Sequence, residues 1–408
     1  MIELTEQQEA QEGGVVVARQ PIFNDGWEVV AYELLYRPLA EAAGPVGPEV
    51  MTAGVLATAF SEVGLDLLVG DRPAHINVTR DFLLDVRPLP LEPKRTVIEL
   101  VEDQKVDNAL VDVLAEAVDA GFTLALDDYV HSPNMKPLLD LASIVKLDIQ
   151  ALTRQELEAE VRKLESRKLT LIAEKIETAD EYELCREMEC FDAYQGYFFA
   201  LPELSRSAAT PTRELGTLAA LAATDIDTSL ETLESIVRRD AGLSHKLLRY
   251  ANSAHVSPLR PISSLRHALT MIGTTAIRRW GLLLAMSGLR DVPSPLLNIA
   301  MLRGRMSELL APSMSAAPDR AFTAGLFSLL DALTGRQMDE LVGELSLDDR
   351  LSDALVSHKG PEGAVLDATL AYERGEFDAA SKRVSTDRLA DAYKQALRWS
   401  DELTPAAA

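Results

Sequence analysis

Short hydrophobic runs alternate with amphipathic segments along roughly the first half of the chain. The runs 15–23 and 27–33 flank an Asn-Asp-Gly turn at 24–26, and two β-prone runs around an Asp-Gly pair are typical of a β-hairpin. The run 123–126 is strand-like and mostly apolar, as strands buried on both faces of a parallel sheet are. Segment 106–119 repeats leucine and valine at every fourth position, which predicts an amphipathic helix.

A polar residue stands at or near the end of nearly every predicted strand. Successive polar residues lie about 20 to 30 positions apart, and the first interval is about twice as long, as the βα units of a barrel imply. Because the carboxyl ends of parallel strands meet at one rim, we predict a TIM-like α/β barrel with an N-terminal β-hairpin and an acidic mouth. The residues that define this mouth are Glu33, Asn77, Glu99, Asp127, Lys146, Glu174 and Gln195.

The second half of the chain reads as helical throughout, after a polar, proline-containing linker at 205–213. Thr228 and Glu231 have the spacing of a capping box that opens a helix with leucine, isoleucine and valine on one face. We therefore expect a disordered acidic tail at 1–14, a barrel at 15–205, and an all-α domain with a C-terminal helical extension at 206–408.

Composition and charge narrow the function classes. The chain has 408 residues, 47% hydrophobic and 25% charged, which indicates ordinary globular domains. A formal net charge of −24 leaves no basic face for direct nucleic-acid binding. The sequence shows no signal peptide, its apolar run 280–286 is far too short to span a membrane, and Cys185 and Cys190 are expected to be reduced thiols. These features predict a cytoplasmic protein.

The adjacent pair Asp127 and Asp128 suggests a cation site, because two neighbouring carboxylates repel each other unless a cation lies beside them. The alternative is a helix N-cap aspartate with a solvated neighbour. The recurrence of polar strand ends along the chain favours the cation.

Glu33-Leu34-Leu35 resembles the signature of EAL domains, the barrel phosphodiesterases that linearise cyclic di-GMP. Leu34 stands where the family usually has alanine, and the resemblance covers residues 15–205 through several separate motifs. The resemblance implies Mg²⁺ or Mn²⁺ as cofactor, and nucleotide contacts by Gln20 and Arg37. It implies a catalytic role for Lys146, Glu174 and Gln195, and metal ligation by Glu33, Asn77, Glu99, Asp127 and Asp128.

The loop after the paired aspartates departs from the family pattern. The family has a glycine-containing loop there that supports the second metal and the barrel dimer, whereas this chain has Tyr-Val-His-Ser-Pro at 129–133. The loop lacks glycine and contains a proline, so we expect a weak or empty second metal position and treat a homodimer as a hypothesis only. His131 is either a replacement ligand or, by the more usual reading, a solvated loop histidine.

The segments 238–253, 262–265 and 268–273 resemble an HDOD domain, an all-helical relative of the HD metal hydrolases. Hydrolysis by that fold needs an adjacent His-Asp pair, and none of the six histidines is followed by aspartate. The resemblance therefore implies a non-catalytic output module that contacts a protein partner. Asn252 and Ser253 are read as turn or capping residues.

Two functions from different classes follow from these resemblances. The first is a bacterial signalling protein whose divergent EAL barrel binds cyclic di-GMP and whose HDOD module contacts partners. The second is an active metal-dependent phosphodiesterase that converts cyclic di-GMP to the linear dinucleotide. The retained ligands favour the second function, and the altered loop and the non-catalytic helical domain favour the first. A third reading, in which the carboxylates serve barrel structure alone, stays open.

Overall fold

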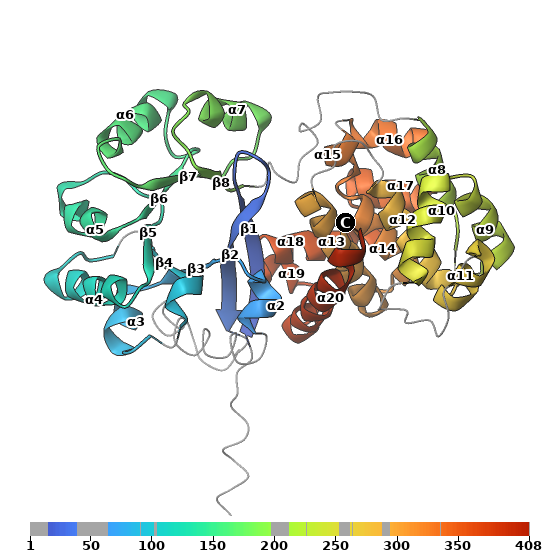
Figure 1. Ribbon diagram of the computed structural model, residues 1–408, viewed down its shortest axis with the longest axis horizontal. Coiled ribbons are helices and arrows are strands. Elements are labelled where there is room, and N and C mark those ends of the chain that lie inside the picture. Colours follow the sequence, from blue (N-terminus) through green and yellow to red (C-terminus); the bar gives the residue numbers. More distant parts are fainter. Residues whose placement is uncertain are drawn as a thin grey trace, which may run out of the picture. The chain divides into compact units, whose positions relative to one another are not determined.

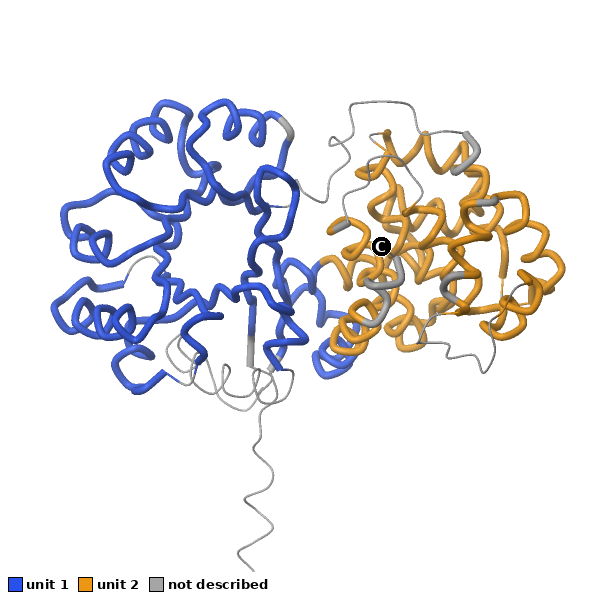
Figure 2. The backbone as a smooth tube through the Cα atoms, in the orientation of Figure 1, with its two compact units in different colours: residues 1–198, 371–391 blue, residues 199–370, 392–408 orange. Residues whose placement is uncertain are grey.

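The computed structural model describes residues 15–38, 64–89, 91–101, 104–196, 212–225, 227–252, 262, 264–287, 294–334 and 336–407. The chain forms two compact units (Figure 2). The barrel unit comprises Met1–Phe198 and Ala371–Asp391, and the helical unit comprises Phe199–Leu370 and Ala392–Ala408. The predicted tail at 1–14 and most of the predicted linker lie outside the described residues.

Eight strands close into a barrel in chain order, which confirms the predicted fold class (Figure 1). The hairpin strands β1 and β2 are antiparallel, β1 also pairs antiparallel with β8, and all other neighbours are parallel. The strands are β1 Val15–Phe23, β2 Val29–Pro38, β3 Ala74–Val78, β4 Thr96–Leu100, β5 Thr123–Leu126, β6 Ile144–Asp148, β7 Thr170–Glu174 and β8 Ala193–Tyr194.

Helices surround the barrel strands (Figure 1) and begin at side-chain caps that the sequence supplies. Thr153 forms a complete capping box with Glu156, and Thr178 forms one with Glu181. The Asp107 carboxylate accepts from the backbone N–H of Leu110 in helix α4. The described helices are α2 Leu65–Val69, α3 Arg80–Asp85, α4 Asn108–Asp119, α5 Lys136–Leu141, α6 Arg154–Leu164 and α7 Ala179–Glu187.

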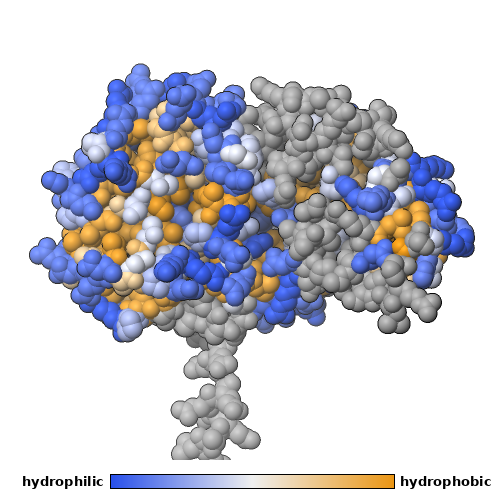
Figure 3. Space-filling model, viewed as in Figure 1, coloured by the Kyte–Doolittle hydropathy of each residue, from blue (hydrophilic) through white to orange (hydrophobic). Residues whose placement is uncertain are grey.

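The barrel core follows the alternation of side chains along each strand. Leu124 and Leu126 of β5 are buried on the face covered by helices, whereas Ala125 faces the barrel interior with Glu99, its register partner. Ile22, Ala31, Ile172 and Ala193 form a separate hydrophobic cluster. On the face drawn in Figure 3, hydrophilic residues form most of the outer edge of the barrel unit, and hydrophobic residues lie inside that edge.

The helical unit contains no strand among its described residues, as the sequence predicts. A large hydrophobic cluster from α8 through α17 forms its core. Its described helices are α8 Thr212–Ala222, α9 Leu230–Arg238, α10 Ala241–Ala251, α11 Leu265–Ile272, α12 Thr274–Met286, α13 Ser294–Leu310, α14 Pro318–Phe327, α15 Leu330–Thr334, α16 Met338–Leu345, α17 Asp349–Ser357, and most of α18 Gly360–Glu373 and of α20 Thr386–Ala407.

The predicted capping box at Thr228 is wrong by one residue. Ser229 is the N-cap of α9 and its side chain accepts from the N–H of Thr232, whereas the Thr228 hydroxyl donates to Asp225 at 2.8 Å. The hydroxyl of Thr228 is thus engaged in the preceding turn. The predicted apolar face is correct, since Leu233 and Val237 are buried in the core of the helical unit.

Asn252 has the structural role that its position predicts. Its amide donates to the carbonyl of Leu248 at 2.9 Å and to that of Ile262 at 2.8 Å, and its side-chain oxygen accepts from the N–H of Ile262 at 2.7 Å. The side chain therefore ties the end of α10 to the segment before α11. Ser253 lies outside the described residues.

Within the described residues, no helix is both long and apolar enough to cross a bilayer. Cys185 is buried, Cys190 is half-buried, and both are free thiols. Burial raises the pKa of the Cys185 thiol to about 12, so this side chain stays protonated at neutral pH.

Residues 371–391 belong to the barrel unit, although they lie far along the sequence from its strands. The Tyr372 hydroxyl donates to the backbone carbonyl of Val17 in β1 at 3.1 Å. Gly375 has φ +75°, and a Cβ added there would lie 2.9 Å from Cδ1 of Leu35 in β2. The segment, which includes α19 Phe377–Ala380, therefore packs directly on the hairpin strands, whereas the sequence division at 205/206 assigns it to the helical domain.

We expect Gly375→Ala to destabilise the barrel unit more than Gly64→Ala does. Both glycines have positive φ, at +75° and +83°, so both variants carry a similar backbone strain. Only at residue 375 does the added methyl group meet a neighbour. That neighbour is the end of the Leu35 side chain, so the extra loss is expected to be about 1 kcal/mol, the low end of what overpacking costs. Urea unfolding followed by the fluorescence of Trp27, in a background with Trp280→Phe and Trp399→Phe, measures the difference. Equal losses in the two variants would contradict the packing of this segment on β2.

Candidate functional site

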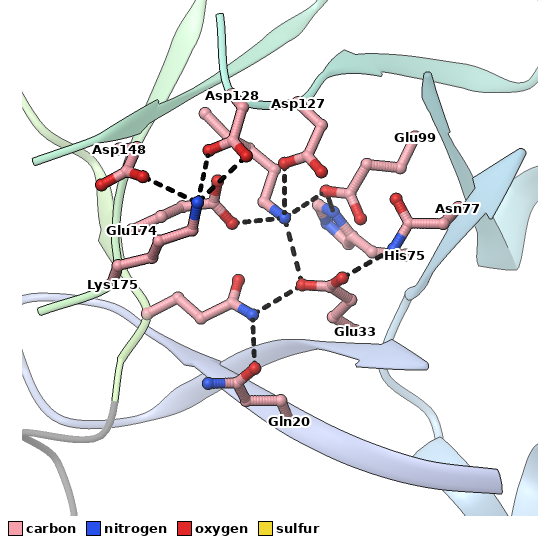
Figure 4. Close-up of polar contacts among 12 residues, drawn as sticks. Gln20, Glu33, His75, Asn77, Glu99, Asp127, Asp128, Asp148, Glu174 and Lys175 are labelled. Carbon is pink, nitrogen blue, oxygen red and sulfur yellow. Dashed lines mark hydrogen bonds and ion pairs between the residues drawn. The ribbon is translucent and has the colours of Figure 1, made fainter. Parts of the chain in front are cut away.

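The carboxyl ends of the strands bring the predicted residues together at one end of the barrel (Figure 4). Glu33 lies on β2, Asn77 on β3 and Glu99 on β4, and Asn77 and Glu99 are register partners. Gln20 joins the set because β1 runs antiparallel and pairs Gln20 with Glu33. The mouth encloses a cavity of about 280 Å³ lined by Gln20, Glu33, Asp127, Asp128, Gln150, Glu174, Lys175, Glu177, Gln195 and Gly196.

Lys146 lies at the centre of this arrangement and is fully buried. Its Nζ lies 2.6 Å from Glu99 Oε1, 2.5 Å from Glu174 Oε1, 3.1 Å from Glu33 Oε2 and 3.3 Å from Asp127 Oδ1. An ammonium with four carboxylates around it is a cation supplied by the chain itself. Lys146 therefore balances part of the negative charge that the strand ends bring together.

Glu33 connects the two sides of the mouth. Its Oε1 accepts from the amide of Asn77 at 2.7 Å, and its Oε2 accepts from Lys146 at 3.1 Å and from the amide of Gln195 at 2.6 Å. The Gln195 amide also donates to Gln20 Oε1 at 3.2 Å. Glu33 thus fixes the orientation of three of the predicted site residues, and these contacts link β1, β2, β3, β6 and the end of β8.

The carboxyl groups of the mouth differ in acidity. Burial alone would lower the pKa of Lys146, but its carboxylate neighbours raise that pKa well above the usual value. Burial raises the pKa of Glu99 as well, yet Lys146 and His75 outweigh burial and lower it to about 2. Burial raises the pKa of Asp127 and Glu174 above their usual values. Because one ammonium faces four carboxylates, we infer that Glu174 and Asp127 take up protons before Glu99 does.

His75 is a site residue that the sequence reasoning did not assign. It lies on β3 two positions before Asn77, is buried, and its Nδ1 lies 3.1 Å from Glu99 Oε1. The signal was present, because residues two apart on a strand share a face. A histidine here contacts one oxygen of Glu99, and the other oxygen is buried without a hydrogen-bond partner.

Asp128 is engaged by a lysine rather than by the loop that follows it. Both of its carboxylate oxygens lie 3.0 Å from Nζ of Lys175, which also lies 2.7 Å from Asp148 Oδ2. Burial lowers the pKa of Lys175, but the hydrogen bonds and charges of the two aspartates outweigh burial. The pKa of Lys175 is therefore raised above its usual value. Neither Lys175 nor Asp148 was assigned a role from sequence.

The altered loop at 129–133 is held by contacts outside the mouth. The N–H of Tyr129 donates to the carbonyl of Lys146 at 3.0 Å, and the Tyr129 ring is buried. His131 is exposed, its Nδ1 lies 3.1 Å from the Tyr129 hydroxyl, and its N–H donates to Glu160 at 3.2 Å. The structure therefore supports the solvated reading of His131 over a role as replacement ligand.

The donor set fits a hard divalent cation in part. Oδ1 of Asn77 and Oε2 of Glu99 are buried without a hydrogen-bond partner, and both are oxygens of the kind that Mg²⁺ and Mn²⁺ take as ligands. Glu33 and Asp127 share the Lys146 ammonium with Glu99, and Glu33 also accepts from the amide of Asn77. Among the described residues, however, no group of three His, Cys, Asp or Glu side chains is arranged as a metal cage, because these carboxylates converge on the Lys146 ammonium.

Two of the sequence hypotheses are outside what the structure describes. Arg37 belongs to β2, but its side chain is not among those described. Residues 197–211, which include most of the predicted linker, also lie outside the described residues. A second cavity of about 750 Å³ lies beside the mouth in the barrel unit and is lined by the ends of β2 and β3, by Val101 and by residues 374–379.

The helical unit shows no metal-type histidine pair among its described residues. None of the six histidines is followed by aspartate in the sequence. His358 Nδ1 contacts Asp367 Oδ1 at 2.5 Å, but these two side chains are exposed, and no third ligand stands with them in the described part of the chain.

Comparison with known proteins identifies the helical unit and two full-length relatives. Residues 217–335 match the HDOD domain. The chain is 30% identical to the uncharacterized protein YuxH of Bacillus subtilis over 407 residues, which cover 96% of this chain and 99% of that protein. It is 29% identical to the cyclic di-GMP phosphodiesterase CdgJ of Vibrio cholerae over 400 residues, which cover 95% of this chain and 92% of that protein.

Solved structures similar to the barrel unit include EAL proteins. A manganese and cyclic di-GMP complex of BlrP1 from Klebsiella pneumoniae is 21% identical, covers 46% of this chain and 56% of its own, and has a TM-score of 0.38. An EAL domain protein from Listeria monocytogenes is 20% identical, covers 48% of this chain and 92% of its own, and also has a TM-score of 0.38.

The relationship to YuxH extends over both units, and the HDOD match lies wholly in the helical one. The closed barrel carries the EAL-like strand ends at Glu33, Asn77, Glu99 and Asp127. On these grounds, the chain belongs to the family of EAL–HDOD signal transduction proteins.

Proposed function

We propose that this protein is a bacterial signalling protein whose barrel mouth binds cyclic di-GMP together with a divalent cation, Mg²⁺ or Mn²⁺. The observation that carries the proposal is the pair of buried, unpartnered oxygens on Asn77 and Glu99, two side chains that directly contact Glu33 and Lys146 of the acidic mouth. Unsatisfied buried acceptors are costly, and a bound cation would satisfy both. The name of the Vibrio cholerae relative identifies cyclic di-GMP as the ligand to test.

The proposed ligands of that cation are Glu33, Asn77, Glu99 and Asp127. When bound, the cation would polarise a phosphate and lower the pKa of a bound water. The other residues act from the chain itself. Gln195 and Gln20, linked by a bond of 3.2 Å, offer amide groups for the nucleotide, and Arg37 is proposed as a further nucleotide contact. Lys146 holds its proton firmly and balances the carboxylates beside the ligand.

Hydrolysis is proposed to be slow or absent. Two-metal phosphodiester hydrolysis needs cations on both the attacking and the leaving oxygen. Asp128, the ligand that a second cation would need, is paired with Lys175 through both of its oxygens. A barrel with one cation binds a phosphate yet activates water poorly.

An active phosphodiesterase is the second candidate function. The observation that favours it is that Lys146, Glu174 and Gln195, the candidate catalytic residues, all reach the mouth, with Lys146 at 2.5 Å from Glu174. These residues would then orient the attacking water and stabilise the leaving group. The proposed binding function and this alternative differ only in turnover.

The helical unit is proposed as an output module that contacts a protein partner. The proposal rests on the HDOD match at 217–335 and on the lack of any histidine followed by aspartate. Formation of a homodimer and location in the cytoplasm remain predictions from the sequence.

A hydrolysis assay separates the two candidate functions. With cyclic di-GMP and Mn²⁺, we expect wild-type protein to release linear dinucleotide at a rate close to that of protein-free buffer. Glu33→Ala, which removes the acceptor for Asn77, Lys146 and Gln195, is the test variant, and Glu28→Ala, at an exposed hairpin position, is the matched control. Robust turnover by wild type and Glu28→Ala, lost in Glu33→Ala, would make the protein an enzyme first.

A further inference from the structure

The Lys175 side chain stands at the outer part of the mouth between two aspartates from different strand ends (Figure 4). Its Nζ lies 3.0 Å from both oxygens of Asp128, which follows β5, and 2.7 Å from Oδ2 of Asp148, which ends β6. Three carboxylate oxygens from two chain segments thus surround one positive charge. Hard cations take oxygens in this way.

Backbone N–H groups hold the Asp148 carboxylate in place. Oδ1 of Asp148 accepts from the N–H groups of Gln150 at 2.8 Å and Ala151 at 3.1 Å, which leaves Oδ2 for Lys175. Asp128 and Lys175 line the mouth, and Asp148 directly contacts Lys175. The carboxylate of Asp148 is therefore oriented before any ligand arrives.

Two of the three residues adopt a backbone conformation that L-residues avoid. Asp128 has φ +41° and lies two residues after the end of β5. Lys175 has φ +58° and directly follows β7. A left-handed conformation is strained for a residue other than glycine, because its Cβ lies too close to the backbone. The strain persists where surrounding contacts offset it. At these two positions, the positive φ values turn the side chains toward each other across the mouth, and the ion pair joins them.

We propose that Lys175 is a tethered cation that occupies the place between Asp128 and Asp148 where a second divalent cation would bind, so that the mouth accepts one divalent cation fewer than its acidic residues would allow. The inference rests on the proposed function, in which the mouth is a cation and nucleotide site. It gives the weak second metal position a cause that differs from the altered loop: the position is filled by a side chain of the chain itself.

Cation stoichiometry tests the proposal without any activity measurement. Full-length wild type and variants are titrated with MnCl₂ in a calorimeter. Lys175→Met and Lys175→Gly remove the ammonium, and glycine also fits the positive φ of this position. Lys175→Arg keeps the charge. We expect both neutral variants to bind one more equivalent of Mn²⁺ than wild type, and Lys175→Arg to match wild type.

The double variants identify the residues that hold the additional ion. Adding Asp128→Asn to either neutral variant is expected to return the stoichiometry to that of wild type. Equal stoichiometry in wild type, Lys175→Met and Lys175→Gly would overturn the proposal. So would an additional ion that survives Asp128→Asn. Circular dichroism spectra confirm that each titrated variant is folded, and two independent neutral variants guard against one that is not.

A separate titration keeps this inference distinct from the proposed function. Cyclic di-GMP is titrated into wild type at saturating Mn²⁺, and that result concerns the function alone. Gain of a Mn²⁺ equivalent in the neutral variants supports the tethered cation whether or not wild type binds nucleotide. Nucleotide binding by wild type, combined with unchanged stoichiometry in the variants, leaves the function in place and overturns the tethered cation.

Discussion

Lys146→Met is expected to destabilise the barrel unit by about 3–5 kcal/mol at neutral pH, the range measured when one partner of a buried ion pair is removed. The Lys146 ammonium is fully buried and lies 2.5–3.3 Å from four carboxylates. Methionine fills a similar volume without charge, so the loss reports the missing positive charge rather than a cavity. Lys163→Met is the control, because the Lys163 ammonium is half-exposed and has Glu160, at 2.6 Å, as its carboxylate partner, so a smaller loss is expected than for the fully buried Lys146 with its four partners.

The loss in Lys146→Met is expected to shrink as the pH falls. Without the ammonium, burial and mutual repulsion raise the pKa of the remaining carboxyl groups above their unfolded values. A carboxyl group whose pKa is higher in the folded state than in the unfolded state stabilises the fold at pH values below its unfolded-state pKa. This contribution is lost as the pH rises through its folded-state pKa. The variant should therefore be closest to wild type near pH 5 and weakest above pH 7. Added Mn²⁺ should restore part of the stability, since a ligand that binds only the folded state stabilises it.

Urea unfolding of wild type, Lys146→Met and Lys163→Met, followed through Trp27 in the Trp280→Phe and Trp399→Phe background, measures these effects at several pH values. Trp27 packs on Phe23 and Tyr182 of the barrel unit, so its signal reports that unit. If Lys146→Met were no weaker than Lys163→Met, or if its loss did not depend on pH, the charge balance described for the mouth would be incorrect.

The barrel and the inner part of its mouth were predictable because strand periodicity carries strong information. Glu33, Glu99, Lys146 and Glu174 each occur at or near the end of an apolar run, and alternation places all four on the inner face. Their convergence then follows from the topology of a parallel barrel. In the structure, the carboxylates of Glu33, Glu99 and Glu174 all contact the Lys146 ammonium. Glu33 and Glu174 also line the cavity of the mouth.

The role of Lys175 was beyond the reach of that reasoning. Glu174 is the last residue of β7 and faces inward, so alternation alone assigns Lys175 to the outer face. The positive φ of Lys175 ends the alternation and returns its side chain to the mouth. A backbone turn of this kind at a residue other than glycine has no sequence signal.

The place of residues 371–391 was also hidden from the sequence. The segment reads as helical, like the residues on either side of it, and helical periodicity does not say which core a helix joins. Its assignment to the barrel unit depends on particular contacts, including Tyr372 with Val17 and Gly375 against Leu35. Contacts between residues so far apart in sequence appear only in the folded structure.

The second large effect expected is the loss of cyclic di-GMP binding when the divalent cation is removed. The proposed cation bridges the acidic mouth and the phosphates, so without it the carboxylates of Glu33, Glu99 and Asp127 repel the nucleotide. Asn77→Ala removes one of the buried, unpartnered oxygens of the site and is expected to weaken cation-dependent binding about 10–100-fold. Asn24→Ala, in the hairpin turn and outside the mouth lining, is the matched control and should bind as wild type does.

Calorimetric titration of full-length protein with cyclic di-GMP, in MnCl₂ and again in EDTA, tests the central claim most directly. The account predicts saturable binding to wild type and Asn24→Ala in MnCl₂, weaker binding to Asn77→Ala, and no measurable binding to any of them in EDTA. Binding of equal strength in MnCl₂ and EDTA, or no binding to wild type under either condition, would contradict it.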